Sequence, residues 1–239
     1  LLINYYKKKG IGSMTEETLN KILERHAHYL AQDVEDWESY RAIFDGLDLS
    51  GMDLSFKNLQ YASFQNVDFS NANLEVSAFR HCNFFGAKFF NTKLDSVHFD
   101  DCDFSFASFT MSNLVSGWSE HCSFKHMRFE TCKMDRAIFS HCKFNRVLFS
   151  NSLMNFSNWY DSIFYEPCTF YNSAILDISM DYIKGIKNIE IKRCTLRDIE
   201  NPVSNRSILY NICRQEYIHY IFCRIKAFFF GQSSLKYWE

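Results

Sequence analysis

The chain has 239 residues and a formal net charge of −2 at pH 7, and it contains only two prolines and eight glycines. This near-neutral balance excludes the overall charge bias of chains that bind nucleic acids or membrane surfaces through net charge. The length is enough for one elongated domain with extensions, and the scarcity of proline and glycine excludes long flexible linkers.

Residues 1–13 differ in character from the rest of the chain. Their apolar start, Leu1-Leu2-Ile3, is too short for the core of a secretory signal. We interpret the segment as a non-native or disordered leader, with Met14 as a candidate natural start.

Residues 15–31 are predicted to form a helix. Ser13 or Thr15 supplies an N-cap, and Glu16 and Glu17 suit the positive end of the helix dipole. One face is apolar, so we expect residues 14–40 to cap the first turn of the domain that follows. That face carries Leu19, Ile22, Leu23, His26 and Leu30.

A large apolar residue occupies every fifth position from Phe44 to Phe164, and only Ser119 interrupts the series. A second inward candidate, usually small, precedes each of these residues by two positions. The period fits neither a helix nor a strand, whereas a chain that turns a corner every five residues explains it. Four corners close one coil of 20 residues, so residues 20 apart should stack.

Residue type follows these columns of 20-residue spacing. Leucine and methionine fill one column, two are almost entirely phenylalanine, and the fourth is mixed. The rings are expected to stack along the axis, with the small residues keeping the coil narrow. The all-phenylalanine column reads Phe44, Phe64, Phe84, Phe104, Phe124, Phe144 and Phe164.

This pattern resembles the pentapeptide-repeat family, whose consensus is A(D/N)Lxx. The segments that match it closely are Leu49-Ser50-Gly51-Met52-Asp53-Leu54 and Phe69-Ser70-Asn71-Ala72-Asn73-Leu74. The resemblance implies an all-β solenoid, a right-handed quadrilateral β-helix, which we assign to residues 41–178. It also implies a chain that is not an enzyme, because members are mostly non-catalytic. A subset resembles DNA in shape and charge, binds type II topoisomerases such as gyrase and gives quinolone resistance.

Bacterial and phage members of that family look similar at the N-terminus, with a short helix that carries a histidine and an aromatic-leucine pair. His26 and Tyr29-Leu30 match this feature. The resemblance therefore implies a bacterial or phage source.

Beyond Phe164 the register shifts by one residue at Pro167, and it fades after Ile178. Residues 181–201 are expected to form one degenerate coil or short strands. Residues 207–230 favour a helix, but charged residues make it a poor membrane span. We assign residues 179–239 to a C-terminal, helical extension that serves as a cap, a homodimerisation helix or, with Phe228-Phe229-Phe230, an interfacial membrane helix.

The nine cysteines do not suggest a disulfide framework. Four of them share one interior column, and no signal peptide opens the chain. They are interpreted as buried thiols in a reducing, cytoplasmic compartment. The four are Cys82, Cys102, Cys122 and Cys142.

No catalytic, cofactor or metal site is predicted. An outward column carries His81, Asp101, His121 and His141, but neighbouring residues point to opposite faces and no C-x-x-C pair occurs. The acidic run of Asp100, Asp101 and Asp103 is interpreted as a solvated face, because a convex rod offers no dry pocket.

Charge divides along the rod. Residues 42–120 carry ten acidic and four basic side chains, and residues 121–166 carry four acidic and six basic ones. A DNA mimic should be acidic along its whole length. Topoisomerase binding is therefore kept as the alternative function.

The outward aromatics favour the leading function. Phe85, Phe90 and Phe106 occupy positions that are usually polar, Phe85 and Phe106 come from adjacent coils near one corner, and Tyr165 shares the column of Phe85. Exposed apolar clusters commonly mark contact surfaces, although packing against a terminal segment is the alternative here. We predict a non-enzymatic protein–protein interaction module with an unidentified protein partner and no direct nucleic-acid binding, and membrane contact is disfavoured.

Overall fold

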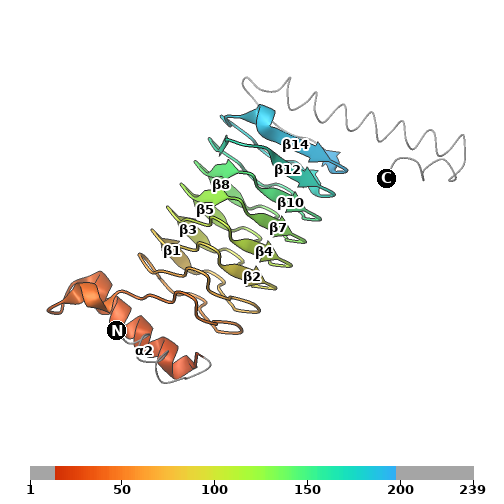
Figure 1. Cartoon of the computed structure of the whole chain (residues 1–239). Helices are drawn as coiled ribbons and strands as arrows, with labels where there is room; N and C mark the ends of the chain where they lie inside the picture. The colour runs from red at the N-terminus through yellow and green to blue at the C-terminus, as the bar shows by residue number, and fades with distance from the viewer. Residues whose placement is uncertain (1–13, 198–239) are drawn as a thin grey trace, which may run out of the picture.

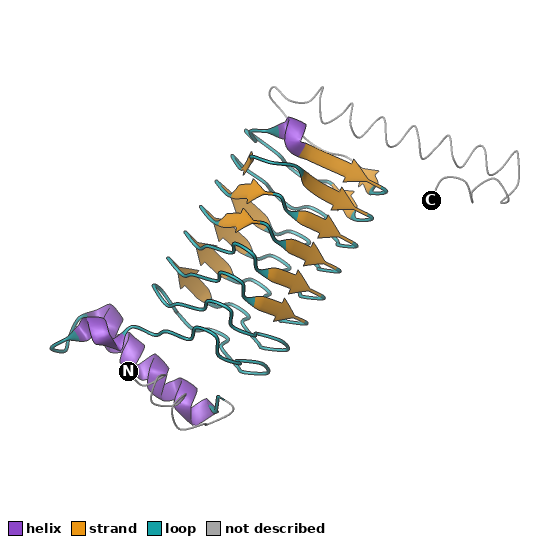
Figure 2. Cartoon of the chain, viewed as in Figure 1, coloured by secondary structure: helices purple, strands orange, loops and turns teal. Residues whose placement is uncertain are grey.

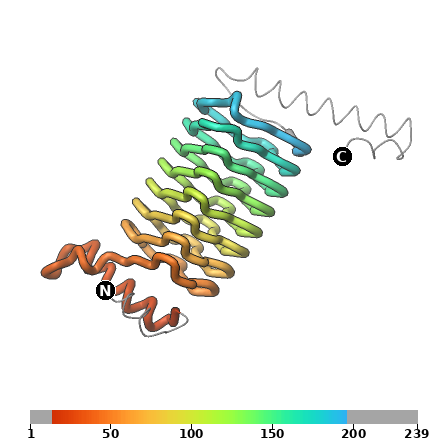
Figure 3. The backbone as a smooth tube through the Cα atoms, viewed as in Figure 1, coloured from red at the N-terminus to blue at the C-terminus, as the bar shows by residue number. Residues whose placement is uncertain are grey.

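The computed structural model describes residues 14–197, and these residues wind into a parallel β-solenoid of about six turns with a helix at the N-terminal end (Figure 1). All strand pairs are parallel, and the partners lie about one 20-residue coil apart. Figure 3 shows the coils stacked one above another along a single axis. The repeat predicted from the sequence is therefore the repeat of the fold.

The N-terminal cap begins with α2 (Glu16–Ala31), which is followed by the short 3₁₀ helix η1 (Trp37–Tyr40). The Thr15 hydroxyl caps α2 by accepting a hydrogen bond from the Thr18 N–H at 3.2 Å. Leu19, Ile22 and His26 are buried on the face that joins the core. The helix thus covers the first coil, as its apolar face predicted.

His26 fastens this cap to the first coil through both of its ring nitrogens. Its Nε2 donates to the Gln60 carbonyl at 2.8 Å, and its Nδ1 accepts from the Ala42 N–H at 3.2 Å. Burial is the main factor that lowers the pKa of His26 below its ordinary value. The neutral ring is therefore the form that suits the site.

Four sheets form the faces of the solenoid (Figure 2). Three of them are centred on the aromatic columns and the fourth on the aliphatic column. The first contains β1 (Ala78–Arg80), β3 (His98–Asp100), β5 (Trp118–Glu120) and β8 (Ile138–Ser140). The second contains β2 (Lys88–Phe90), β4 (Ser108–Thr110), β7 (Arg128–Glu130), β10 (Leu148–Ser150), β12 (Cys168–Tyr171) and β14 (Ile189–Lys192). The third contains β6 (Ser123–Lys125), β9 (Lys143–Asn145) and β11 (Ile163–Phe164), and the fourth contains β13 (Ala174–Leu176) and β15 (Thr195–Arg197).

Each corner between two faces has a residue with left-handed backbone. A positive φ occurs at every fifth position from Gly46 to Asp161. A hydrogen bond across the corner closes the turn, as from the Leu47 N–H to the Phe44 carbonyl at 2.9 Å. This backbone geometry turns the chain after every five residues and gives the quadrilateral coil.

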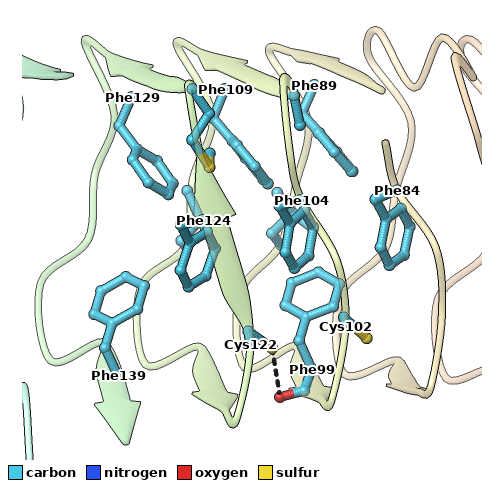
Figure 4. Packing of buried hydrophobic residues seen from close by; sticks show 14 of the residues in the cluster. Phe84, Phe89, Phe99, Cys102, Phe104, Phe109, Cys122, Phe124, Phe129 and Phe139 are labelled. Atoms are coloured by element: carbon cyan, nitrogen blue, oxygen red, sulfur yellow. Dashed lines mark hydrogen bonds between the residues drawn. The ribbon is translucent and has the colours of Figure 1, made fainter. Parts of the chain in front are cut away.

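Stacked rings fill the core, as the columns predicted (Figure 4). Phe104 stacks on Phe84 with ring centroids 4.8 Å apart and on Phe124 at 5.3 Å. Edge-on contacts join neighbouring columns, as between Phe99 and Phe104 at 4.9 Å. Parallel offset rings within columns and edge-on rings between them are both favourable aromatic geometries.

The small inward residues close the core with hydrogen bonds. Several serine, threonine and cysteine side chains donate to the carbonyl of the residue 23 positions earlier, on the preceding coil. Cys122 donates to the Phe99 carbonyl in this way, at 3.6 Å (Figure 4). Burial raises the pKa of Cys132 to about 12. These thiols are buried, as predicted, and they act as small weak donors.

The solenoid extends beyond residue 178, the domain end assigned from the sequence, into short strands as expected for residues 181–201. The shift at Pro167 occurs as expected, since Phe149 pairs with Phe170, 21 residues later. The coil then continues through the 3₁₀ helix η2 (Ile186–Asn188), and β14 and β15 pair with β12 and β13. The five-residue spacing shifts by one residue at η2, and buried isoleucines still fill the core.

Two predicted segments lie outside the described residues. They are the leader at residues 1–13 and, beyond residue 197, the helix at 207–230 with its capping, dimerisation and membrane alternatives. Within residues 14–197, no helix has both the length and the apolar character required to cross a bilayer.

Candidate functional site

The predicted aromatic surface is built around a contact between two adjacent coils. Phe85 and Phe106 are exposed, and their ring centroids lie 5.3 Å apart. Phe106 also stacks on His126 of the following coil at 5.1 Å. Two exposed phenylalanines, Phe85 and Phe106, and the half-buried His126 therefore form a row of contacting rings across three coils, which we call the aromatic ridge.

The corner geometry explains why the ridge forms. Phe106 occupies a left-handed corner position with φ of 61°, so its side chain leaves the coil at the turn rather than from a strand. One coil earlier, the corner residue is Gly86, which has no side chain to separate the two rings. A Cβ at Gly86 would lie 2.3 Å from Oδ1 of Asn66, and its φ of +67° also favours glycine.

Basic residues flank the ridge. Lys88 and Arg128 are exposed on the adjacent sheet, where they stand on either side of Ser108. Lys125 is exposed as well, and its carbonyl accepts the Phe106 N–H at 2.8 Å. Asp103, on the coil of Phe106, is occupied by hydrogen bonds from the Ser105 N–H and hydroxyl. The ridge therefore combines an apolar centre with a positive rim.

The other two predicted surface residues are exposed but lie apart from the ridge. Phe90 belongs to β2 on the neighbouring face, where it pairs with Thr110. Tyr165 follows β11, four coils after Phe85. Among residues 14–197, no ring contact joins either of them to Phe85 or Phe106. The four residues that the sequence grouped together are thus one pair and two separate aromatics.

Sequence reasoning missed a second exposed aromatic contact. Trp118 stacks on His98 with ring centroids 4.9 Å apart. The two residues are register partners in neighbouring strands, and Ile138 is the partner of Trp118 on its other side. Trp118 points outward while Ser119 takes the buried position, so the tryptophan does not fill the gap in the phenylalanine column. Trp118 directly precedes an inward position in the sequence, and this placement could have predicted that its side chain is exposed.

The acidic run is more structured than the predicted solvated face. Asp101 is solvated and contacts Nδ1 of His81 at 2.7 Å. The side chain of Asp100, by contrast, is only 17% exposed and accepts from Nε of Arg80 at 2.8 Å. Burial, followed by the nearby Glu75 carboxylate, raises the pKa of Asp95. Within the described residues, these contacts join charges along the outer columns and form no nucleophile–base pair.

Comparison with known proteins agrees with this architecture. The family model described as pentapeptide repeats matches residues 40–75 and 82–116, with eight copies. No curated protein matches the sequence.

Solved structures of the same repeat type are also similar. One is trypsin-treated QnrB1, a plasmid-mediated fluoroquinolone resistance protein, at 16% identity and a TM-score of 0.40, covering 65% of this chain and 90% of that one. Another is a pentapeptide repeat protein from the thylakoid lumen of Arabidopsis thaliana, at 26% identity and a TM-score of 0.39, covering 41% of this chain and 68% of that one. The family match, together with the five-residue corners and the stacked core, shows that residues 40–75 and 82–116 carry pentapeptide repeats.

Proposed function

We propose that this chain is a non-enzymatic scaffold that binds a protein partner through the aromatic ridge. The single observation that carries the proposal is the exposed Phe85–Phe106 contact, at positions where this fold can place polar side chains without cost to its core. Exposed aromatic side chains that cluster, rather than occur singly, are typical of binding surfaces.

The rim of the ridge indicates the chemistry of the partner. Three exposed basic residues lie on the coils that carry the ridge: Lys88, Lys125 and Arg128. A complementary segment would place an apolar side chain against Phe85 and Phe106 and acidic side chains against the rim. Such charge complementarity mainly increases the association rate and the specificity of binding.

The test compares two double variants of the full chain in affinity purification from the source organism. Phe85→Ser with Phe106→Asn removes the ridge, and asparagine is chosen because it tolerates the left-handed corner. Phe90→Ser with Tyr165→Ser removes two exposed aromatics outside the ridge and serves as the control. A partner that is retained by the control and lost by the ridge variant supports the proposal.

The captured partner then permits a sharper measurement. Its affinity should fall when salt is raised and when Lys125→Glu is introduced, because the rim supplies part of the attraction. Partners that bind the ridge variant as strongly as the original chain would contradict the proposal.

DNA mimicry directed at gyrase is the less supported alternative. The basic residues Lys88 and Arg128 lie on one face, and the second half of the rod carries more bases than acids. A duplex mimic needs negative charge along its length. Gyrase supercoiling that is altered by micromolar protein, or protected from a quinolone, would support this alternative over the ridge.

Homodimerisation through the C-terminal segment is a further proposal, carried by the sequence of residues 179–239. The strand pairing to residue 197 indicates where a shortened chain should end. Light scattering should show a dimer for the full chain and a monomer for residues 14–197. A monomer in both cases would exclude this role.

A further inference from the structure

We infer that the corner at the end of β5 and β8 is a surface site for a divalent transition-metal ion, with Glu120, His121 and His141 as ligands. Ligand atoms of these three residues all lie within 4.8 Å of one another. The two imidazole rings are 5.1 Å apart with an interplanar angle of 32°. Nothing in the proposed scaffold function requires this arrangement.

Strand register brings the three ligands together. Glu120 is the last residue of β5 and pairs with Ser140 of β8, so the residues that follow, His121 and His141, are corner residues one coil apart. The His121 N–H donates to the Ser140 carbonyl at 3.0 Å, which fixes the relation of the two corners. Both histidines have φ of 54°, so their side chains leave the coil in the same way.

The corner backbone alone accounts for a histidine at these positions, because histidine is among the residues enriched in left-handed backbone. It does not account for the other groups that converge there. Nδ1 of His121 lies 3.4 Å from Oδ1 of Asp100, and Nδ1 of His141 lies 2.7 Å from the Ser140 hydroxyl. Metal-binding histidines commonly hold one ring nitrogen with such a partner and bind the ion through the other.

These contacts leave Nε2 of each ring as the metal donor. Nε2 of His141 also lies 3.6 Å from Oδ2 of Asp161, which can serve as a fourth ligand or orient a bound water. Asp100 is itself held by Arg80, so its position is fixed from the side opposite His121. The site therefore has three ligands, one nearby carboxylate and partners that orient both rings.

The donor set favours zinc or a neighbouring ion over magnesium or calcium, because imidazole suits the borderline transition metals and the harder ions prefer oxygen. Two histidines and one glutamate are a known zinc set that leaves a position open. Zinc–ligand distances of about 2.0–2.2 Å require the donor atoms to move closer together than they lie here. The exposed side chain of His121 and the half-buried side chain of His141 lie outside the core, so they can make this movement without disturbing it.

No metal site was predicted from the sequence, because each histidine and the cysteine next to it point to opposite faces and no C-x-x-C pair occurs. Six of the seven cysteines within residues 14–197 are buried. The third ligand, Glu120, is an outward strand residue, and only the register of β5 with β8 places it beside both histidines.

The test is isothermal titration of the full chain with zinc chloride under reducing conditions. We expect binding of one ion that His121→Asn, His141→Asn and Glu120→Gln each weaken by about 10-fold or more, a loss typical of damaged metal sites. His81→Asn is the matched control, because His81 is an exposed corner histidine of the same column. Asparagine keeps the left-handed corner in all three histidine variants.

Unfolding supplies a second readout. Zinc should raise the Tm of the original chain and of His81→Asn, and it should not raise that of His141→Asn, because an ion bound only by the folded state stabilises that state. Equal zinc binding by His121→Asn, His141→Asn and the original chain would overturn the inference and assign the ion to thiols. Equal loss in His81→Asn, or no measurable binding at all, would overturn it as well.

Discussion

The inward and outward positions of this solenoid follow opposite rules. Inward positions repeat from coil to coil, and their side chains are fully buried in stacked columns from Phe44 to Phe164. Outward positions change chemistry from coil to coil, as in the column of His81, Asp101, His121 and His141. Because each coil contacts only its neighbours, the core favours a large apolar residue at every turn of a column, while the surface is free to vary. Candidate functional residues are therefore expected at outward positions whose residue type differs from coil to coil.

The same comparison explains why some departures from the repeat pattern do not disturb the fold. Ser119 is the one polar residue in the central inward series up to Phe164, and it remains buried without pulling Trp118 inward. Exposed aromatics such as Phe106 lie at corners, where the backbone conformation rather than packing is the constraint.

The largest expected effect contrasts two phenylalanines that lie two residues apart. Phe104→Ala should lower the free energy of unfolding by about 3–5 kcal/mol, because its ring contacts phenylalanines on two adjacent coils and in two neighbouring columns. Phe106→Ala should change it by about 0.5 kcal/mol or less, since that ring is exposed. Denaturant unfolding measures both, and similar losses in the two variants would remove the distinction between inward and outward positions.

A second prediction concerns the cap. His26→Leu should cost roughly 1–3 kcal/mol for each buried group left without a partner, namely the Ala42 N–H and the Gln60 carbonyl. His28→Leu is the matched control on the same helix, because His28 is exposed and contacts only Asp33 and Tyr40 among its described partners. Denaturant unfolding at neutral pH compares them, and equal stability of the two variants would show that His26 does not fasten the cap.

Acid should weaken the same contact. The pKa of His26 is lower in the folded chain than its ordinary value of 6.5, so below that value the unfolded chain binds more protons than the folded one. The stabilisation is fully present above about pH 6.5 and is lost as the pH falls towards the lower folded value. Urea unfolding at several pH values should show this slope in the original chain and a smaller slope in His26→Leu. An unchanged slope in the variant would assign the acid sensitivity to other groups.

The smallest expected effect applies one substitution to two valines. Val76 is an exposed corner residue with φ of 58°, a strained conformation for a β-branched side chain. Val76→Gly should raise the free energy of unfolding by about 0.5–1 kcal/mol, the strain released less the entropy cost of glycine. Val67→Gly should instead lower it by about 3 kcal/mol, because Val67 is fully buried. Destabilisation by both substitutions would show that the corners are not strained.

Sequence by itself was sufficient for the core, including details such as the one-residue shift at Pro167 and the buried face of α2. It was insufficient for the last coils, where η2 interrupts the five-residue spacing although Ile189 and Ile191 remain buried. It also brought Phe85 and Phe106 together correctly, because adjacent coils and a shared corner can be counted along the chain.

The periodic spacing of large apolar residues determined the coil, its length and its interior, because a side chain that must fill the same space at every turn leaves a repeating record in the sequence. Only the tertiary structure decided which outward residues meet. It separated Phe90 and Tyr165 from the aromatic ridge and placed Glu120 beside His121 and His141. Those contacts depend on corner backbone angles and on side-chain directions across coils. No repeated packing constraint acts on these outward residues, so the sequence shows no periodic pattern that would predict the contacts.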